Sequence, residues 1–161
     1  MCLRDADYPD PVTTLHRAPL RDIPAETLYR ILWLRVEVFV VEQQAAYPEL
    51  DGRDLESETE LLWIEGEGRN VLATLRLLHD DGPDAAARIG RVATAAEARG
   101  SGLAADLMRA AVDRAGERRP GLPLVLDAQE HLAPWYARFG FVISGERFSE
   151  DGIPHVPMTR A

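Results

Sequence analysis

A glycine-rich turn joins a β-type run to an amphipathic helix, and this junction constrains the fold more than any other feature of the chain. The run Arg88–Thr94 is typical of a strand, and a brief loop then leads to Gly100 and Gly102 at the entrance of a helix. From Ser101 to about Arg118, apolar residues recur four positions apart (Leu103, Leu107, Ala111 and Ala115). A strand, a turn and a helix in this order predict a sheet with a helix packed on its face.

The flanking sequence alternates between strand and helix patterns. Apolar residues at helical spacing predict a first helix over 25–40, and Pro24 and Glu26 suit its first turn. Hairpin strands followed by a strand-helix-strand-helix-strand order place the chain in the α/β (or α+β) class, with a mixed sheet and helices on its faces. The other predicted elements are strands over 13–17, 61–65, 71–79, 122–127, 141–148 and 156–160, a short helix over 132–139, and a turn at Asp151-Gly152.

Length and composition narrow the class of protein. The 161 residues, 46% of them hydrophobic, fit one domain over 1–161, with a loose leader over 1–12. A net charge of -9 disfavours a nucleic-acid partner and suits a cationic small molecule. All 18 cationic side chains are arginine, which excludes a lysine Schiff base and a P-loop lysine.

Cysteine and histidine usage adds further limits. Cys2 is the only cysteine, so a disulfide framework and a multi-thiolate zinc site are excluded. The four histidines show no metal-ligand spacing, and we expect no metal. Neither a signal-peptide pattern nor an apolar run of membrane length occurs, so we expect no membrane partner and a cytoplasmic location. The oligomeric state stays open, a homodimer included.

The glycine pair has two local interpretations. A helix start leaves several N–H groups without partners and carries a partial positive charge, so glycines there let a phosphate rest on the backbone. Arg99 adds a cation beside such a site. Alternatively, Gly100 and Gly102 make a tight turn and Ser101 caps the helix.

Gly100-x-Gly102-x-x-Ala105 also satisfies the dinucleotide-binding fingerprint, with Asp127 in place of the ribose-binding acid. In that fold, however, the strand runs almost directly into the first glycine, whereas residues 95–99 intervene here. Only 34 residues follow Asp127, too few for the remaining parallel units of such a sheet. A nicotinamide-binding oxidoreductase is therefore disfavoured.

Two motifs at suitable separation resemble the GNAT superfamily of acetyl-coenzyme A-dependent N-acyltransferases. The run Arg99-Gly100-Ser101-Gly102-Leu103-Ala104 matches R-x-x-G-x-G/A, the pyrophosphate-binding motif of that family. The run Trp135-Tyr136-Ala137-Arg138-Phe139-Gly140-Phe141 resembles its F-Y-x-x-x-G-F signature, with tryptophan at the first position. More narrowly, the runs at 35–43, 51–54, 90–92 and 150–155 resemble the ElaA-like branch.

The resemblance implies a mostly antiparallel central sheet flanked by helices and an enzyme that moves an acetyl group from acetyl-CoA to a primary amine. The stretch from Glu42 to Glu58 carries six carboxylates, and we expect it to form a surface loop or a short helix instead of a core element. This acidic loop suggests a small cationic acceptor. The alternative is a non-catalytic acyl-CoA-binding module that acts as a sensor or an interaction partner.

The resemblance also implies roles for individual residues. Tyr136 would give its proton to the coenzyme A thiolate; the alternative is a core aromatic beside Trp135 and Phe139. Glu42 is the first candidate for the base or the ammonium-binding group, although most acidic stretches are solvated surfaces. His155 is a second candidate for contacting the acceptor or relaying a proton, and a packed or surface histidine is the alternative. The predicted cofactor-binding residues are Val92, Ala93 and Thr94 through their backbone, Arg99, Gly100, Ser101, Gly102, Leu103 and Ala104 of the turn, and Gln129, which could equally begin a helix.

Three arginines stand among apolar neighbours on predicted helices or strands. A buried guanidinium needs a partner of opposite charge. We expect Arg35 and Arg91 to form salt bridges with the acidic loop, and leave open whether Arg76 does the same or contacts substrate.

Overall fold

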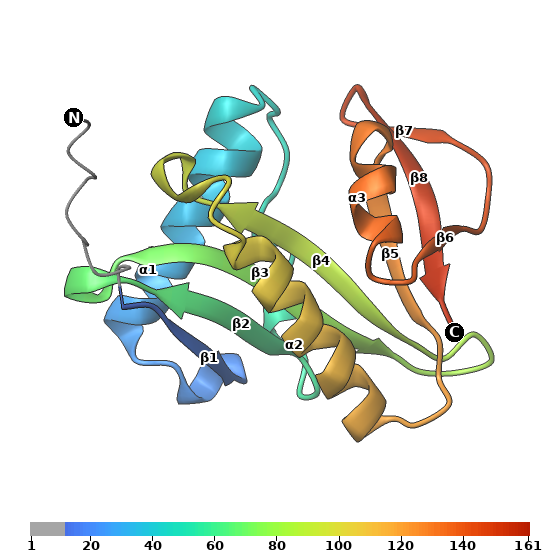
Figure 1. Ribbon diagram of the computed structural model, residues 1–161, viewed down its shortest axis with the longest axis horizontal. Helices are drawn as coiled ribbons and strands as arrows, with labels where there is room; N and C mark the ends of the chain where they lie inside the picture. The colour runs from blue at the N-terminus through green and yellow to red at the C-terminus, as the bar shows by residue number, and fades with distance from the viewer. Residues whose placement is uncertain (1–11) are drawn as a thin grey trace, which may run out of the picture.

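A computed structural model describes residues 12–161, so the predicted leader lies outside the described residues except for Val12. The described residues form one sheet of eight strands in the order β1-β2-β3-β4-β5-β8-β6, with β7 paired to β8 (Figure 1). Every paired set is antiparallel except β4 and β5, which are parallel. The predicted mixed, mostly antiparallel sheet is therefore confirmed. The strands are β1 (Thr14–Ala18), β2 (Glu60–Glu65), β3 (Val71–Asp80), β4 (Ala86–Thr94), β5 (Leu124–Gln129), β6 (Val142–Ile143), β7 (Phe148–Glu150) and β8 (Ile153–Arg160).

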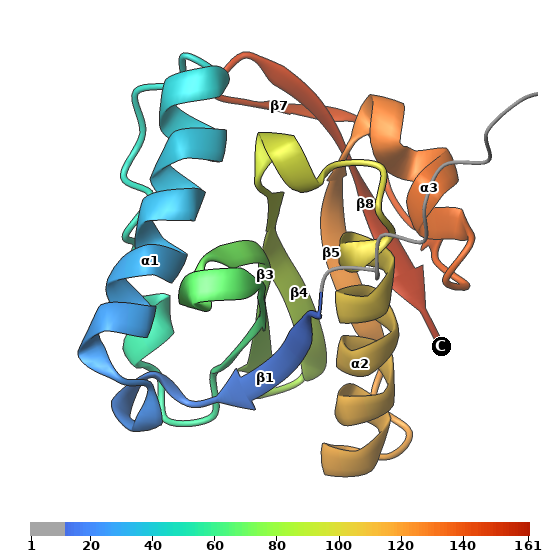
Figure 2. The ribbon, with the colours of Figure 1, turned by 60° about the vertical axis from the view of Figure 1, so that its left-hand side comes forward.

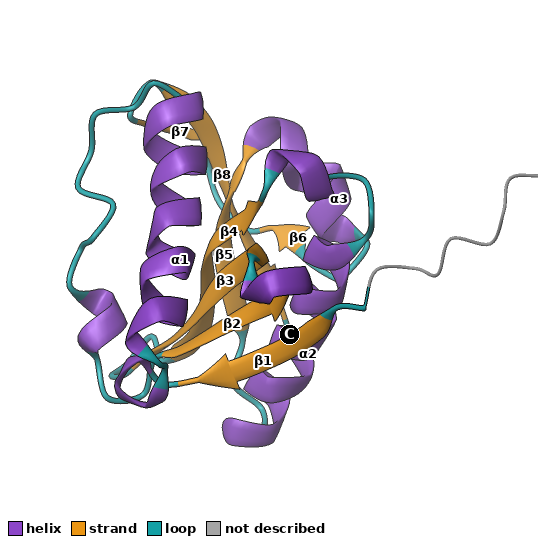
Figure 3. Ribbon diagram, turned by 90° about the vertical axis from the view of Figure 1, so that its left-hand side faces the viewer, coloured by secondary structure: helices purple, strands orange, loops and turns teal. Residues whose placement is uncertain are grey.

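Helices cover both faces of this sheet, with α1 on one face and α2 and α3 on the other (Figures 2 and 3). Leu61 and Trp63 of β2 pack in the apolar cluster on the α1 side, whereas Leu62 and Ile64 pack in the cluster on the α2 side. This alternation is what successive residues of a strand require. The helices are α1 (Ala25–Val36), α2 (Leu103–Arg118) and α3 (Ala133–Ala137), and short helical turns are η1 (Leu20–Asp22), η2 (Glu37–Glu42), η3 (Arg53–Leu55), η4 (Glu67–Arg69), η5 (Ala96–Ala98) and η6 (Glu130–Leu132).

The predicted first helix is confirmed, but its last turns are not α-helical. α1 stops at Val36, and the chain continues as a π-helical turn, η2, that ends at Glu42. η2 contains a run of β-branched and aromatic residues (Val38, Phe39, Val40 and Val41), whose stiff side chains crowd a regular α-helical turn. π-helical turns are frequent at functional sites. Within residues 12–161, no helix is long and apolar enough to cross a membrane.

The strand predicted over 141–148 is wrong as a continuous element, because β6 and β7 are two short strands separated by a loop. β6 pairs with Thr159 and Met158 of β8. The next residue of β8 in that direction is Pro157, which has no N–H group to extend the ladder. Gly145 also passes so close to Pro157 that a Cβ atom there would lie 2.8 Å from its Cγ. The chain leaves the sheet at this point and returns as β7.

His79 of β3 is a buried histidine, 6% exposed, and neither of its ring nitrogens has a hydrogen-bond partner among the described residues. Burial lowers the pKa of His79, and the charges of Arg118 and Arg119 lower it further, against the opposing effect of Glu58 and Glu60. The folded protein therefore takes up a proton here less readily than the unfolded chain, in which a histidine has a pKa of about 6.5. The contribution of His79 to the free energy of unfolding therefore falls as the pH drops below that value.

We accordingly expect His79→Leu to reduce the acid sensitivity of the fold, because leucine cannot take up a proton at this buried position. The measurement is Tm between about pH 7.5 and about pH 5, a range that brackets the titration of an unfolded histidine. Wild-type Tm should fall more steeply over this range than the Tm of the variant. Parallel curves would show that other groups carry the acid sensitivity.

Candidate active site

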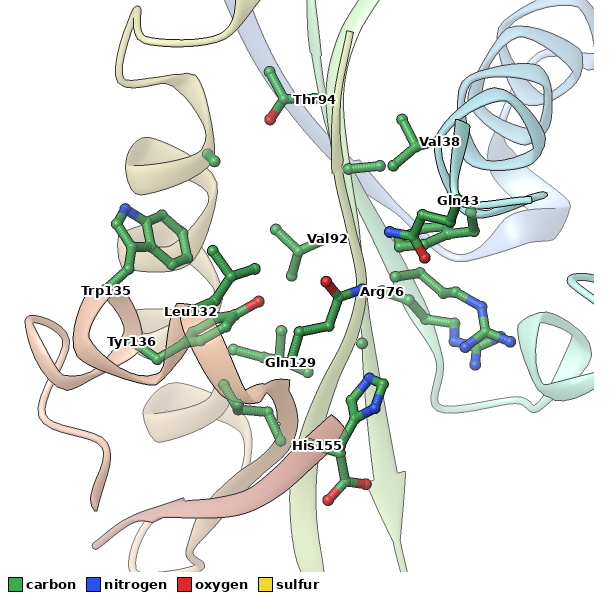
Figure 4. A pocket seen from close by; sticks show the side chains of 18 of the residues that line it. Val38, Gln43, Arg76, Val92, Thr94, Gln129, Leu132, Trp135, Tyr136 and His155 are labelled. Atoms are coloured by element: carbon green, nitrogen blue, oxygen red, sulfur yellow. The ribbon is translucent and has the colours of Figure 1, made fainter. Parts of the chain in front are cut away.

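A cavity lies where β4 and β5 separate. The two strands pair only through residues 87–88 of β4 and 124–125 of β5, and they diverge beyond these residues. The space between them belongs to a cavity of about 1270 Å³. Its lining comes from both helical layers: Trp135 and Tyr136 lie on one side of β4 and Gln43 on the other (Figure 4). The cavity therefore extends through the plane of the sheet.

The predicted phosphate-binding turn forms one end of this cavity. Gly100 and Gly102 have left-handed φ values of 81° and 85°, and a Cβ atom at either position would meet nothing within 4 Å. Gly102 is the N-cap residue of α2, and no side chain caps that helix. Ser101 is therefore not the cap that the alternative interpretation required; its hydroxyl donates to the carbonyl of Ala98. The residues of the turn that line the cavity are Arg99, Gly100, Gly102, Leu103 and Ala104, without Ser101.

This arrangement fits a phosphate group. α2 has 16 residues, and the N–H groups of its first turn have neither an intrahelical acceptor nor a side-chain cap. Such a helix start attracts an anion through both its N–H groups and the helix dipole. Because glycines occupy both left-handed positions, no side chain stands between the main chain and the cavity.

β4 carries a bulge next to the cavity. Between the cross-strand pairs Thr74–Ala93 and Arg76–Gly90, β4 has one residue more than β3. Arg91 lies in this bulge with a left-handed φ of 55°. The predicted backbone donors Val92, Ala93 and Thr94 line the cavity, and β4 has no strand partner on the β5 side at these positions. Their role as hydrogen-bond donors stays a prediction.

Tyr136 of α3 is 8% exposed and lines the cavity, with its hydroxyl directed toward the space beside Val92 (Figure 4). Its ring makes edge contacts with Trp135 and Phe141, at centroid distances of 4.8 and 6.4 Å. Burial raises the pKa of Tyr136 to about 12. The phenol is therefore protonated throughout the physiological pH range and is able to donate a proton.

Gln129 and His155 face each other across the end of the β5–β8 ladder, and both line the cavity (Figure 4). His155 is 9% exposed, and its ring stacks on Phe148 at 5.7 Å. Its Nδ1 lies 2.8 Å from the carbonyl oxygen of Ile153. Since a carbonyl only accepts, Nδ1 carries the hydrogen, and Nε2 of the neutral ring keeps a lone pair. The Glu150 carboxylate lies 3.8 Å from Nε2.

Glu42, the first candidate for the base, pairs with Arg99, the predicted phosphate-binding cation. Nη2 of Arg99 donates to both carboxylate oxygens of Glu42, at 2.9 and 2.7 Å, and Nε donates to the carbonyl of Thr94. Both side chains are partly exposed, at 47% and 40%. This ion pair links the end of η2 to the turn before α2. Each side chain partly neutralises the charge that the other needs for its predicted role.

We expect Glu42→Ala to bind acetyl-CoA about as tightly as wild type or up to about fivefold more tightly, because an exposed ion pair is worth only about 0.2–1 kcal/mol and its loss frees Arg99 for the pyrophosphate. Isothermal titration calorimetry at low and moderate salt provides the measurement. Arg99→Ala serves as the opposite control and should weaken binding. Weaker binding by Glu42→Ala would show that Glu42 does not compete with the anion.

The acidic stretch is a mostly exposed loop with one short helical turn, as predicted, but two of its carboxylates are not at the surface. Glu49 and Asp54 are buried, at 4% and 6% exposure, and η3 lies in this segment. Each of its seven carboxylates, counted from Glu42 to Glu60, lies within ion-pair distance of an arginine (Glu42 with Arg99, Glu49 with Arg35 and Arg91, Asp51 with Arg76 and Arg91, Asp54 with Arg35 and Arg76, Glu56 with Arg53, Glu58 with Arg118, and Glu60 with Arg17, Arg114 and Arg118). The interpretation of a solvated acidic surface is therefore wrong for Glu49 and Asp54, whereas the side chains of Glu42, Glu56 and Glu58 are 40% to 46% exposed.

The predicted salt bridges of Arg35 and Arg91 to the acidic loop are confirmed, and Arg76 joins them. Arg76 is 3% exposed and donates to both oxygens of Asp51 at 2.8 Å. These hydrogen bonds hold the pKa of Asp51 well below its usual range. Arg76 thus forms the salt bridge that the sequence left open; because it also lines the cavity, a substrate contact stays a prediction.

Sequence reasoning did not assign several residues on the α1 side of the cavity to the site, namely Val38, Phe39, Gln43, Ala45, Tyr47 and Arg53. Asp51 of the acidic loop and Arg76, which the sequence left open as a substrate contact, also line the cavity. The signal that could have found some of them is the combination of three arginines in apolar runs with a carboxylate-rich loop. Within residues 12–161, no group of three His, Cys, Asp or Glu side chains is placed to hold a metal ion. A metal-free reaction stays a prediction.

Comparison with known proteins agrees with this geometry. The sequence model of the acetyltransferase (GNAT) domain family matches residues 23–161. A UPF0039 protein of Mycobacterium tuberculosis is 48% identical over 147 residues, which cover 91% of this chain and 92% of that protein. Protein ElaA of Escherichia coli is 36% identical over 141 residues, covering 86% of this chain and 90% of ElaA.

Solved structures lead to the same family. The crystal structure of an acyl-CoA N-acyltransferase from Pseudomonas aeruginosa superposes with a TM-score of 0.87 at 40% identity, covering 93% of this chain and all of that one. Together with the split sheet, the open turn at α2 and the buried tyrosine, these matches show that the chain belongs to the GNAT acetyltransferase family of acyl-CoA-dependent N-acyltransferases.

Proposed function

We propose that this chain transfers an acetyl group from acetyl-CoA to the primary amine of a small cationic acceptor. The observation that carries the proposal is the cavity through the sheet. The uncapped start of α2, which suits an anion, forms one end of this cavity, and the protonated Tyr136 lines it. In this proposal, the pyrophosphate rests on the main chain of the turn over 99–104. The pantetheine arm follows β4, and Gln129 donates or accepts a hydrogen bond along it.

The acceptor must lose a proton before it attacks. An alkylamine with a pKa of about 10.4 is neutral in only about 1 molecule in 2,500 at pH 7, a deficit of about 4.6 kcal/mol. We assign the proton acceptor to His155, because its Nε2 keeps a lone pair and lies in the cavity. Glu42, the first candidate from the sequence, becomes the second, because its use as a base requires its ion pair with Arg99 to open.

The remaining steps follow from the same geometry. The amine nitrogen forms a bond to the acyl carbon, and the charge that develops on the acyl oxygen is stabilised by main-chain N–H groups of residues 92–94. The carbon–sulfur bond breaks, and Tyr136 gives its proton to the departing thiolate. His155 holds the first proton taken from the ammonium group and releases it to water. The nitrogen loses its second surplus proton from the tetrahedral intermediate, and that proton replaces the one that Tyr136 gives to the thiolate. The products are the amide, coenzyme A with a free thiol, and one proton in water.

The support for a cationic acceptor comes from the β7–β8 turn. Glu150 and Asp151 line the cavity, and among the described residues Glu150 has only His155 as an ionic partner. Because the acidic stretch is paired with arginines, these two carboxylates are better placed to attract an ammonium group. We also propose that the enzyme acts in the cytoplasm, with the single cysteine of the chain as support.

The test combines binding and turnover. Acetyl-CoA should raise Tm, since a ligand that binds only the folded state stabilises it. The purified chain is then incubated with acetyl-CoA and a panel of polyamines, amino acids, aminoglycosides and peptides, and free thiol and acetylated product are measured. Thiol release that depends on an amine supports the proposal. Binding without any amine-dependent release would favour the non-catalytic acyl-CoA sensor.

A further inference from the structure

Arg91 combines an unusual backbone conformation with an extensive set of ionic contacts. Its φ of 55° lies in the left-handed region, which arginine seldom adopts and glycine adopts freely. Gly90 precedes it, and its φ is not positive. The sequence thus has arginine where the backbone favours glycine. A strained residue of this kind persists only where its surroundings hold it.

Two carboxylates hold the guanidinium of Arg91. Its Nε lies 2.7 Å from Oε2 of Glu49, an ion pair whose N–H direction is too bent for a hydrogen bond. Its Nη2 donates to Oδ2 of Asp51 at 3.3 Å and to the carbonyl of Glu49 at 3.4 Å. The guanidinium also lies over the ring of Tyr47, 5.4 Å from its centre. The side chain is 21% exposed, so water screens these contacts only in part.

Two further arginines, Arg35 and Arg76, hold these two carboxylates in place. Arg35 of α1, 1% exposed, donates through Nε to Glu49, and it also binds Asp54 at 2.8 Å. Arg76 of β3 binds Asp51 through both terminal nitrogens. Arg76 pairs with Gly90 across the two strands, directly beside the bulge. A clamp of three arginines (Arg35, Arg76 and Arg91) and three carboxylates (Glu49, Asp51 and Asp54) thus joins α1, the acidic loop, β3 and β4.

The bulge that this clamp contacts determines which face of the sheet each side chain at the end of β4 points to. Ala87 and Ile89 pack in the apolar cluster beneath α2. After the bulge, Val92 packs against that cluster and Ala93 packs in the cluster beneath α1. The residues of β4 that face α2 therefore have odd numbers before the bulge and even numbers after it, because the bulge inserts one extra residue. Without the bulge, every main-chain group of residues 92–94 would be turned over.

We propose that Arg91 is a positioning residue, which holds the bulge of β4 so that the main-chain N–H groups on the open edge of residues 92–94, those not directed at β3, face the acyl carbonyl. The inference rests on the proposed function, since it requires an acyl-CoA carbonyl beside β4. Arg91 acts through the backbone and does not touch the reacting atoms. Stability alone is a poor explanation for the clamp, because buried ion pairs are on average no more stabilising than apolar residues of similar size.

The test measures the acyl carbonyl directly and needs no acceptor. Acetyl-CoA labelled with ¹³C at the thioester carbonyl is bound to the protein, and its carbonyl stretch is recorded by isotope-edited infrared spectroscopy. Wild type should lower this frequency relative to free acetyl-CoA. Arg91→Ala should return it toward the free value. Arg91→Gly should keep more of the shift than Arg91→Ala, because glycine adopts the left-handed conformation without strain.

Calorimetry provides a second readout with acetyl-CoA and coenzyme A as probes. One added hydrogen bond should make wild type prefer acetyl-CoA by about threefold to tenfold. Arg91→Ala should lose this preference with its affinity for coenzyme A unchanged. If Arg91→Ala does not fold, Asp51→Asn takes its place, since it weakens the clamp with little change in size, and it should lose part of the shift.

Arg88→Ala is the matched control. Arg88 also lies on β4, lines the same cavity and pairs with the carboxylates of Asp80 and Asp127, but it precedes the bulge. Its loss should leave the carbonyl frequency unchanged. The proposal is overturned if Arg91→Ala, or Asp51→Asn where it replaces that variant, shows the wild-type carbonyl frequency. It is also overturned if Arg91→Ala and Arg91→Gly lose the frequency shift equally. If wild type binds neither probe, the proposed function itself is wrong.

Discussion

In Gly102→Glu, the affinity for acetyl-CoA falls by about 100-fold or more, as expected when an added carboxylate faces the pyrophosphate at the start of α2. A Cβ atom at Gly102 would enter open space, so the carboxylate of the variant reaches the position that the phosphate needs. The φ of 85° adds backbone strain, which costs roughly 1–2 kcal/mol of folding free energy for a residue other than glycine. Isothermal titration calorimetry measures the affinity, and Tm measures the strain.

Gly121→Glu separates these two effects. Gly121 follows α2, has a φ of 82° and also has open space at its Cβ position, but it does not line the cavity. This variant should lose a similar amount of Tm and keep wild-type affinity. Gly102→Ala, which adds no charge, should fall between wild type and Gly102→Glu. Equal affinity of Gly102→Glu and wild type would place the pyrophosphate elsewhere.

In Tyr136→Phe, turnover with any active acceptor falls by about 100-fold, the lower end of what general acid catalysis contributes. The affinity for acetyl-CoA should change little, because the ring keeps its contacts with Trp135 and Phe141. Since burial raises the pKa of Tyr136 to about 12, the wild-type rate should show no loss from deprotonation of this phenol below that pH. Steady-state kinetics with free-thiol detection provide the measurement.

A change of leaving group identifies the chemical role. An acetyl thioester of a more acidic thiol needs less help from an acid, so the defect of Tyr136→Phe should shrink with such a donor. Tyr29→Phe is the control for the loss of a phenol, because Tyr29 is 70% exposed and lies on α1 away from the cavity. A defect of the same size with both donors would assign Tyr136 to packing or orientation.

The order of elements was predictable because its signals are local. The apolar residues of α2 recur at helical spacing, and glycines stand where the backbone turns. The prediction of a strand over 141–148 failed because its limit is set by Pro157, a residue of another strand. The π-helical turn after α1 was also not predicted, because helical periodicity alone does not distinguish a π turn from an α turn.

The two halves of the site, the turn over 99–104 and the clamp on the α1 side, also differ in how local their sequence signals are. The turn over 99–104 is one short motif, and its backbone shape follows from neighbouring residues, although the side chain of Arg99 is held by the distant Glu42. The clamp on the α1 side joins Arg35 to Glu49, 14 residues apart, and Glu49 to Arg91, 42 residues apart. The sequence indicated that Arg35 and Arg91 pair with the acidic loop, but charge pairing over such separations has no local pattern, so the individual partners and the burial of Glu49 and Asp54 were not predictable.

A cavity that crosses the sheet is lined from both helical layers. In the proposed function, acetyl-CoA enters beside α2 and α3, and the amine approaches from the side of α1 and the β7–β8 turn. The two substrates then occupy opposite halves of one cavity, so a ternary complex forms and the transfer needs no acyl-enzyme intermediate.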